Sequence, residues 1–108
     1  MRFVIFQPRQ ADGSPSHPAV RSRWHILLHA SQREDKDNLF IYTACAPNAG
    51  WGNYIPHYHE IDGANFEPPS LSMDEYCEAC FQSSMINRLL KARIKRYIDE
   101  TSAYQIHP

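Results

Sequence analysis

The sequence predicts an α+β fold in which a small, mainly antiparallel sheet of about four strands packs on a C-terminal helical segment. In the first part of the chain, short runs of β-branched and aromatic residues alternate with polar stretches that contain glycine and proline, which is typical of strands and turns. Beyond residue 70 the apolar residues recur at helical spacing instead. The length of 108 residues fits a single domain over 1–108, with a polar loop at 8–20 and a polar C-terminal tail at 99–108.

The first two strands are predicted from apolar runs near the N-terminus. The run Phe3–Phe6 is continuous and is stopped by Pro8, so we expect a strand that is buried on both faces. The second run covers residues 23–29 and alternates along its length. Successive side chains of a strand point to opposite faces. One face is therefore expected to carry Trp24, Ile26 and Leu28, and the other His25, Leu27 and His29.

Two further strands follow in the middle of the chain. Residues 39–45 have high β propensity and are expected to form an antiparallel hairpin with the second strand, across the charged connector 31–38. Residues 47–53 contain proline, asparagine and glycine, which predicts a turn. The fourth strand covers 54–61, and Pro56 indicates a strand at the edge of the sheet.

The helical segment has a clear start signal. Ser72 followed by Glu75 matches a capping box, and a stripe of apolar residues at helical spacing begins there. The stripe slips out of phase at 82–84, so the pattern fits either one kinked helix or two helices that meet near Ser84. Residues 93–98 fit a continued helix better than a last strand.

We expect the helical stripe to cover one face of the sheet, because an amphipathic helix must bury its apolar side. The predicted core consists of Trp24, Ile26, Leu28, Phe40, Tyr76, Phe81, Leu89 and Leu90. The opposite face of the second strand would carry His25 and His29, and curvature of the sheet would turn that face into a pocket.

Charge and composition narrow the class of partner. Eleven basic and twelve acidic residues give a net charge of −1, which argues against nucleic acid and against a membrane surface. The N-terminal apolar run is too short for a secretory signal. Three cysteines in such a chain indicate free thiols and a cytoplasmic or otherwise intracellular location. A partner protein or a small molecule is the expected ligand, and a homodimer is possible.

The densest cluster of reactive groups lies at 55–62, where His57 and His59 share one face of the expected strand. His25 and His29 share a face of the second strand, and the four imidazoles would meet if the two strands were close and these faces coincided. Such a group could act in acid–base catalysis, with His57, His59, His25 and His29 as the catalytic candidates. Two or three of them could also bind zinc or iron, with a carboxylate or water completing the shell. An exposed sheet face that needs polar residues is the simpler alternative.

The ligand-binding candidates surround the same cluster. They are Trp51, Tyr54, Tyr58 and Glu60. Glycines flank Trp51, so its turn would either present the indole as a recognition anchor or fold it back over the edge of the core.

Cys77 and Cys80 have the spacing of half a zinc site or of a redox pair. A zinc site needs a second pair of ligands, and His57 with His59 is the pair that the spacing suggests. The capping box would place Cys77 well inside the helix and both cysteines on its apolar stripe, so we expect buried structural thiols.

Basic residues crowd the end of the helical segment at Arg88, Lys91, Arg93, Lys95 and Arg96. A solvated helix face is the expected role, and contact with phosphate or with an acidic protein surface is the alternative.

Two hypotheses of function follow from different classes. The first is a small non-catalytic binding or interaction module that uses a histidine-bearing sheet face or the Trp51 loop. The alternative is a small cofactor-light enzyme, an isomerase, cyclase or hydrolase, that uses His57 and His59 for acid–base or metal chemistry. The sequence does not identify a cofactor.

Overall fold

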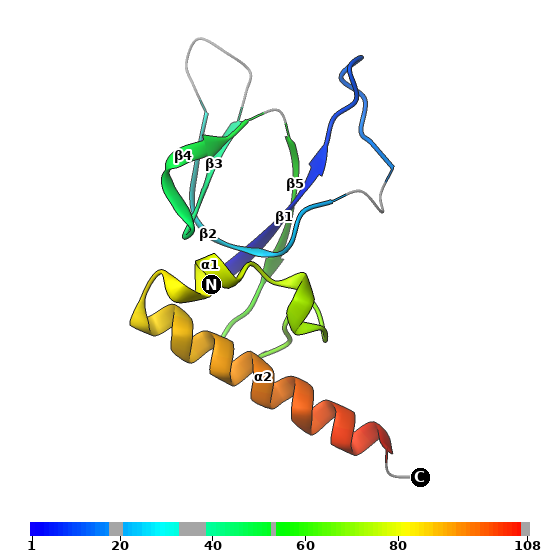
Figure 1. The fold of residues 1–108 in the computed structure, drawn as a ribbon, viewed down its shortest axis with the longest axis vertical. Coiled ribbons are helices and arrows are strands. Elements are labelled where there is room, and N and C mark those ends of the chain that lie inside the picture. Colours follow the sequence, from blue (N-terminus) through cyan, green and yellow to red (C-terminus); the bar gives the residue numbers. More distant parts are fainter. Residues whose placement is uncertain (18–20, 33–38, 53, 107–108) are drawn as a thin grey trace.

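The predicted class is confirmed in a computed structural model, which describes residues 1–17, 21–32, 39–52 and 54–106. A five-stranded antiparallel sheet is followed by helices that lie against one side of it (Figure 1). The sheet has five strands rather than four. The elements are β1 (Arg2–Pro8), β2 (His25–Gln32), β3 (Leu39–Thr43), β4 (Ala46–Trp51), β5 (Tyr54–Glu60), a 3-10 helix (Met73–Glu75), α1 (Glu78–Gln82) and α2 (Met85–Ile106).

β1 lies between β2 and the edge strand β5 in the sheet, whose strand order is β4-β3-β2-β1-β5. Phe3 pairs with Ile26 of β2 on one side and with His59 of β5 on the other. Five consecutive residues of β1 are buried, from Phe3 to Gln7. The expected burial of this strand on both faces is therefore confirmed, and the reason is that apolar clusters lie above and below it.

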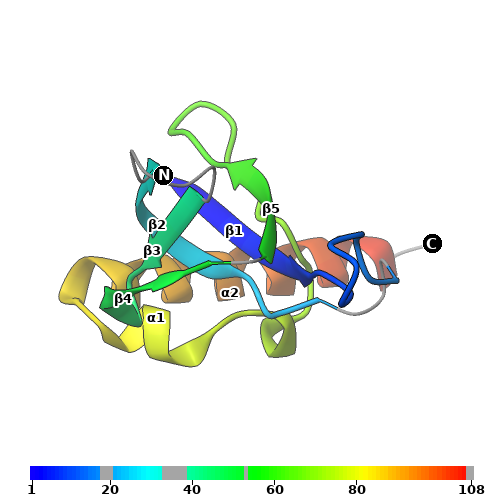
Figure 2. The ribbon, with the colours of Figure 1, turned by 90° about the horizontal axis from the view of Figure 1, so that it is seen from above.

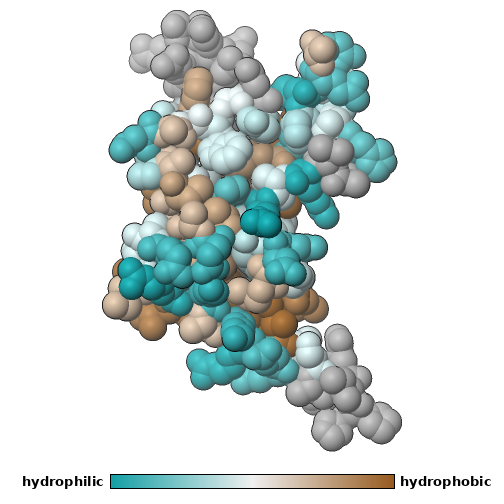
Figure 3. All heavy atoms as spheres, in the orientation of Figure 1, coloured by the Kyte–Doolittle hydropathy of each residue, from teal (hydrophilic) through white to brown (hydrophobic). Residues whose placement is uncertain are grey.

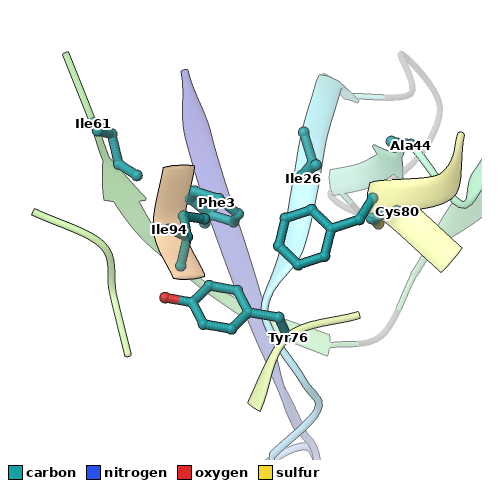
Figure 4. Close-up of a cluster of buried hydrophobic side chains, with 8 residues drawn as sticks. Phe3, Ile26, Ala44, Ile61, Tyr76, Cys80 and Ile94 are labelled. Carbon is teal, nitrogen blue, oxygen red and sulfur yellow. The ribbon is translucent and has the colours of Figure 1, made fainter. Parts of the chain in front are cut away.

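The larger cluster lies between the sheet and the helices (Figure 4). It contains Phe3, Ile26, Ala44, Ile61, Tyr76, Cys80, Phe81 and Ile94. A smaller cluster occupies the other face of the sheet. It contains Val4, Phe6 and Ile41, with Leu27 and Trp51 packed against them.

β4 is a strand that the sequence did not predict, since it lies in the proposed turn at 47–53. It pairs with β3 through Ile41–Trp51 and Thr43–Ala46, with a register shift between these pairs. Pro47 and the neighbouring asparagine and glycine gave a turn signal, and the irregular pairing explains how a strand accommodates them. The other outermost strand, β5, contains Pro56, as expected of an edge strand. The proposed connector between β2 and β3 lies largely outside the described residues.

Three of the eight predicted core residues, Ile26, Tyr76 and Phe81, are buried. Trp24, Phe40 and Leu90 are half-buried. The remaining two predictions were wrong. Leu28 is 50% exposed and Leu89 is 64% exposed.

Leu28 is exposed because the alternation of β2 is broken at this point. Leu27 pairs with Thr43 and His29 pairs with Tyr42, so Leu28 is the extra residue of a β-bulge. A bulge moves the following side chains out of the simple alternation on which the prediction depended.

Leu89 is exposed because α2 turns a different stripe to the sheet. Ile94 is fully buried, and Leu90 and Ile98 pack against the same cluster. Leu89 is the residue before the first member of this stripe, and its side chain therefore points to the solvent side of the helix.

The helical segment consists of two helices that meet near Ser84, one of the two alternatives the sequence left open. The Ser84 Oγ accepts the backbone N–H of Asn87 at 3.1 Å and so caps the start of α2. Residues 93–98 are helical, as predicted, and α2 continues through the expected polar tail to Ile106. Figure 2 shows α2 running beneath the sheet when the molecule is seen from above.

The predicted capping box does not form. Ser72 precedes only the short 3-10 helix, with no hydrogen bond from its side chain to the helix start. The Glu75 carboxylate instead accepts the hydroxyl of Ser70. Tyr76 then takes an extended conformation and bridges to Trp24, which interrupts the helix before α1 begins.

The orientation of α2 predicts a large difference between two neighbouring substitutions. Ile94→Ala should lower the free energy of unfolding by about 2–5 kcal/mol, because it leaves a cavity in the main cluster. Leu89→Ala, the matched control, should change it by about 0.5 kcal/mol or less, because that side chain is mostly solvated. Urea denaturation followed by circular dichroism measures both values, and equal costs would contradict the orientation of the helix described here.

Candidate metal centre

Two distant segments of the chain dock at the start of β2, on Trp24 just before the strand and on Ile26 within it. The backbone N–H of Trp24 donates to the Glu75 carbonyl at 2.7 Å, and the N–H of Cys77 donates to the Trp24 carbonyl at 2.8 Å. In the turn between β3 and β4, the N–H of Ala44 donates to the Ile26 carbonyl at 2.9 Å. His25 therefore lies where the segment before α1 and the β3–β4 turn both meet β2.

This docking brings four potential metal ligands together, namely His25, Cys45, Cys77 and Cys80. Their ligand atoms all lie within 4.8 Å of one another. The Nδ1 atom of His25 is 3.5 Å from the Cys45 sulfur and 3.6 Å from the Cys80 sulfur. One nitrogen and three sulfur atoms thus surround a single point at the junction of the sheet and the helices.

Burial sets the protonation of two of these groups. Burial lowers the pKa of His25 to about 4, so its imidazole is neutral near pH 7 and can offer a lone pair to a metal ion. Burial raises the pKa of the Cys80 thiol to about 12 in the metal-free protein. The backbone N–H groups of Ile26 and Cys45 oppose this rise, because their hydrogen bonds to the Cys80 sulfur favour the thiolate.

The donor set suits zinc better than any harder cation. Thiolate and imidazole are the ligands that structural zinc sites use, in sets that include three cysteines and one histidine. Four protein ligands fill a tetrahedral shell and leave no open position for a substrate. Such a centre can join segments of the chain, and it is not built for metal-assisted catalysis.

Two expectations about the cysteines need correction. Cys77 is the residue that precedes α1, and not a position well inside a helix, because the extended Tyr76 delays the helix start. The partners of the Cys77–Cys80 pair are His25 and Cys45, and not His57 with His59. Cys80 is buried in the main cluster and Cys77 is half-buried beside it, so the expectation of packed thiols holds for their surroundings.

The sequence contained only part of the signal for this centre. The Cys-x-x-Cys spacing is visible, but His25 in β2 and Cys45 in the β3–β4 turn are single residues with no characteristic spacing between them. The sequence placed Cys45 at the end of the strand predicted over 39–45, whereas it lies in the turn after β3, and no local signal pointed to that position.

The structure does not bring the four candidate imidazoles together. β1 lies between β2 and β5, so the two strands are not neighbours. His59 is opposite Phe3 and His25 is opposite Val4, and Phe3 and Val4 point to different faces. His25 therefore lies on the other face of the sheet from His57 and His59.

The other three histidines each have local partners. The ring Nε2 of His57 is 3.0 Å from the side-chain oxygen of Gln7, and that of His59 is 2.7 Å from the Glu67 carbonyl. His29 stacks on Tyr42 with the ring centres 4.5 Å apart.

Trp51 folds back over the sheet, which is the second of the two alternatives for its turn. Its indole stacks on Phe6 with a centroid distance of 4.5 Å, and the edge of Tyr54 packs against it at 5.4 Å. The indole N–H donates to the Thr43 hydroxyl at 3.4 Å. Trp51 is thereby part of the smaller cluster rather than an exposed anchor.

Tyr58 and Glu60 line a hollow of about 440 Å³ together with Arg2 and His29. The described pairs between β1 and β2 end with Phe3–Ile26, and the first residues of β1 and the bulged part of β2 form the walls of this hollow. Partial burial raises the pKa of the Tyr58 phenol, and the charge of Arg2 opposes that rise. The hollow includes His29 in its lining, as expected of a pocket on this face, although His25 lies outside it.

Comparisons of the chain with family models, with curated proteins and with solved structures found no match. Within the described residues, no helix combines the length and the apolar composition needed to cross a bilayer.

The contacts of His59 predict a structural role that can be measured. His59→Ala should lower the free energy of unfolding by about 1 kcal/mol, because the Glu67 carbonyl loses its hydrogen-bond partner. The variant also loses the edge contact between Trp24 and the imidazole, whose ring centres are 6.2 Å apart in the unaltered protein. Glu60→Ala on the same strand is the control and should change stability by about 0.5 kcal/mol or less. Equal stabilities of the two variants in urea denaturation would show that the His59 contact contributes nothing.

Proposed function

We propose that this protein is a non-catalytic interaction module that binds a partner protein through the solvent face of α2. The observation that carries the proposal is an apolar patch made of Met85, Ile86 and Leu89, which are 64%, 70% and 64% exposed. These side chains occupy the first turns of one helix and are neighbours on its surface. Clustered, highly exposed apolar side chains are typical of interaction sites, whereas single ones are not.

The charges of α2 favour an acidic partner. The helix carries five basic and two acidic residues, while the whole chain has a net charge of −1. Lys91 forms an ion pair with Glu78 at 2.6 Å, and Arg93 lies over the ring of Phe66 at 4.1 Å. The other three basic side chains form no ion pair with any described residue. They are Arg88, Lys95 and Arg96.

Apolar and basic side chains are therefore presented on one helix, a combination that complements an amphipathic acidic segment. Figure 3 shows hydrophobic surface at the helical end of the molecule, next to hydrophilic side chains. A partner helix with leucines on one face and glutamates beside them would cover both.

A specific observation also favours a small-molecule ligand as the second candidate. The hollow beside β1 places the side chains of Arg2, Glu60 and Tyr58 around one space. Its size is within the range of about 300–1,000 Å³ found for ligand pockets. The enzymatic alternative based on His57 and His59 stays a prediction, and the Nε2 atoms of the two rings are held by Gln7 and Glu67.

The test uses two synthetic helical peptides with the same leucine face, one flanked by glutamates and the other by lysines. We expect the glutamate peptide to bind and to shift the methyl NMR signals of Met85, Ile86 and Leu89, and we expect higher salt to weaken binding. Leu89→Asp should reduce the affinity at least tenfold, because it places a like charge against the acidic peptide.

The matched control is Leu28→Asp, which replaces another exposed leucine, on β2, and should leave peptide binding unchanged. Equal binding of the two peptides, or the same loss in both variants, would refute the proposed surface. Signal changes confined to Leu28, Tyr58 and Glu60 would move the binding site to the hollow.

A further inference from the structure

We infer that His25, Cys45, Cys77 and Cys80 form a structural zinc site with one Zn²⁺ held by three thiolates and a neutral imidazole. This inference is independent of the proposed binding surface, since it concerns the interior junction of the sheet with the helices. It predicts that the protein contains zinc whether or not α2 binds a partner protein.

The distances match those of a tetrahedral centre. Zinc bonds of about 2.3 Å to sulfur and about 2.0–2.1 Å to nitrogen imply ligand separations of about 3.6 Å for N–S pairs and about 3.8 Å for S–S pairs. The two N–S distances from His25 are 3.5 Å and 3.6 Å. Every pair of ligand atoms lies within 4.8 Å, so movements of side chains alone can complete the shell.

The surroundings of Cys80 favour coordination over thiol chemistry. A reactive cysteine sits in an exposed, electropositive place that lowers its pKa. Cys80 is only 1% exposed, in the main apolar cluster. A disulfide between Cys77 and Cys80 would not involve Cys45 or His25. One zinc ion, in contrast, would be bound by all four side chains.

Backbone contacts around the centre supply the supporting shell of hydrogen bonds that metal sites need. The N–H of Ala44 donates to the Ile26 carbonyl at 2.9 Å, and the N–H of Cys77 donates to the Trp24 carbonyl at 2.8 Å, so both neighbouring segments are held beside His25. Asn87 donates from its side chain to the Cys80 carbonyl at 3.2 Å and to the Ser83 hydroxyl at 2.8 Å. These bonds fix the segment from Cys80 to the start of α2 against the centre.

Zinc at this point would join three segments that are distant in the sequence. His25 comes from β2, Cys45 from the β3–β4 turn, and Cys77 with Cys80 from the start of α1. Binding releases the thiol protons and ties these three segments to one another, so zinc binding should stabilise the folded protein.

The first experiment is elemental analysis of the full, untagged protein by mass spectrometry against its dialysis buffer. We expect about one zinc ion per chain. Cys80→Ser and His25→Gln should lower the zinc content at least tenfold, because each removes one of four ligands. The double variant His57→Gln/His59→Gln is the control and should keep its zinc, although it removes the pair that the spacing suggested.

A second measurement keeps the test valid if a ligand variant fails to fold. A strong chelator should lower the melting temperature of the unaltered protein, and added zinc should restore it. Cobalt(II) exchanged into the unaltered protein should give the intense visible absorption of a tetrahedral thiolate site.

The inference would be overturned if the protein contained no zinc and its melting temperature changed with neither the chelator nor added zinc. Stoichiometric iron would overturn the choice of metal, and zinc lost only in the His57/His59 variant would overturn the choice of ligands. Leu89→Asp should keep its full zinc content, so failure of the binding surface and failure of the zinc site give different results.

Discussion

The structure depends on the docking of two distant segments on Trp24, which precedes β2, and on the first two residues of β2. Trp24 and Ile26 offer backbone groups to the segment before α1 and to the β3–β4 turn, with His25 between them. These hydrogen bonds hold the helical layer against the sheet and bring the three cysteines to the imidazole. The main apolar cluster closes over the same place, with Phe3, Tyr76 and Phe81 packed together, and so shields these bonds from water.

The sequence predicted those features that depend on local pattern. A continuous apolar run gave β1, high β propensity gave β3, and helical spacing gave α1 and α2 with their break near Ser84. The burial of Ile26, Tyr76 and Phe81 followed from the same periodicities. The prediction failed where the periodic pattern of side chains did not match the tertiary structure. Leu28 is exposed because of a bulge in β2, and Leu89 because α2 turns another side to the sheet. No local sequence pattern contains either effect.

The ligands of the candidate metal centre were likewise predicted only where they lie close together in the sequence. The Cys77–Cys80 pair was visible because both ligands lie in one short segment. Its partners, His25 in β2 and Cys45 in the β3–β4 turn, meet only through the order and pairing of the strands. His57 and His59 formed the most conspicuous histidine pair in the sequence, but they lie on the other face of the sheet from His25. The reason is that successive side chains of a strand point to opposite faces.

Both outermost strands of the sheet contain a proline, Pro47 in β4 and Pro56 in β5. A proline has no N–H, so a foreign strand laid along either margin would find the ladder of hydrogen bonds interrupted. Addition of further strands into stacked or fibrous assemblies is thereby disfavoured, even though each of the two edge strands is paired on one side only. Contacts through side chains, where charge and shape can discriminate between partners, are correspondingly favoured over pairing through the backbone.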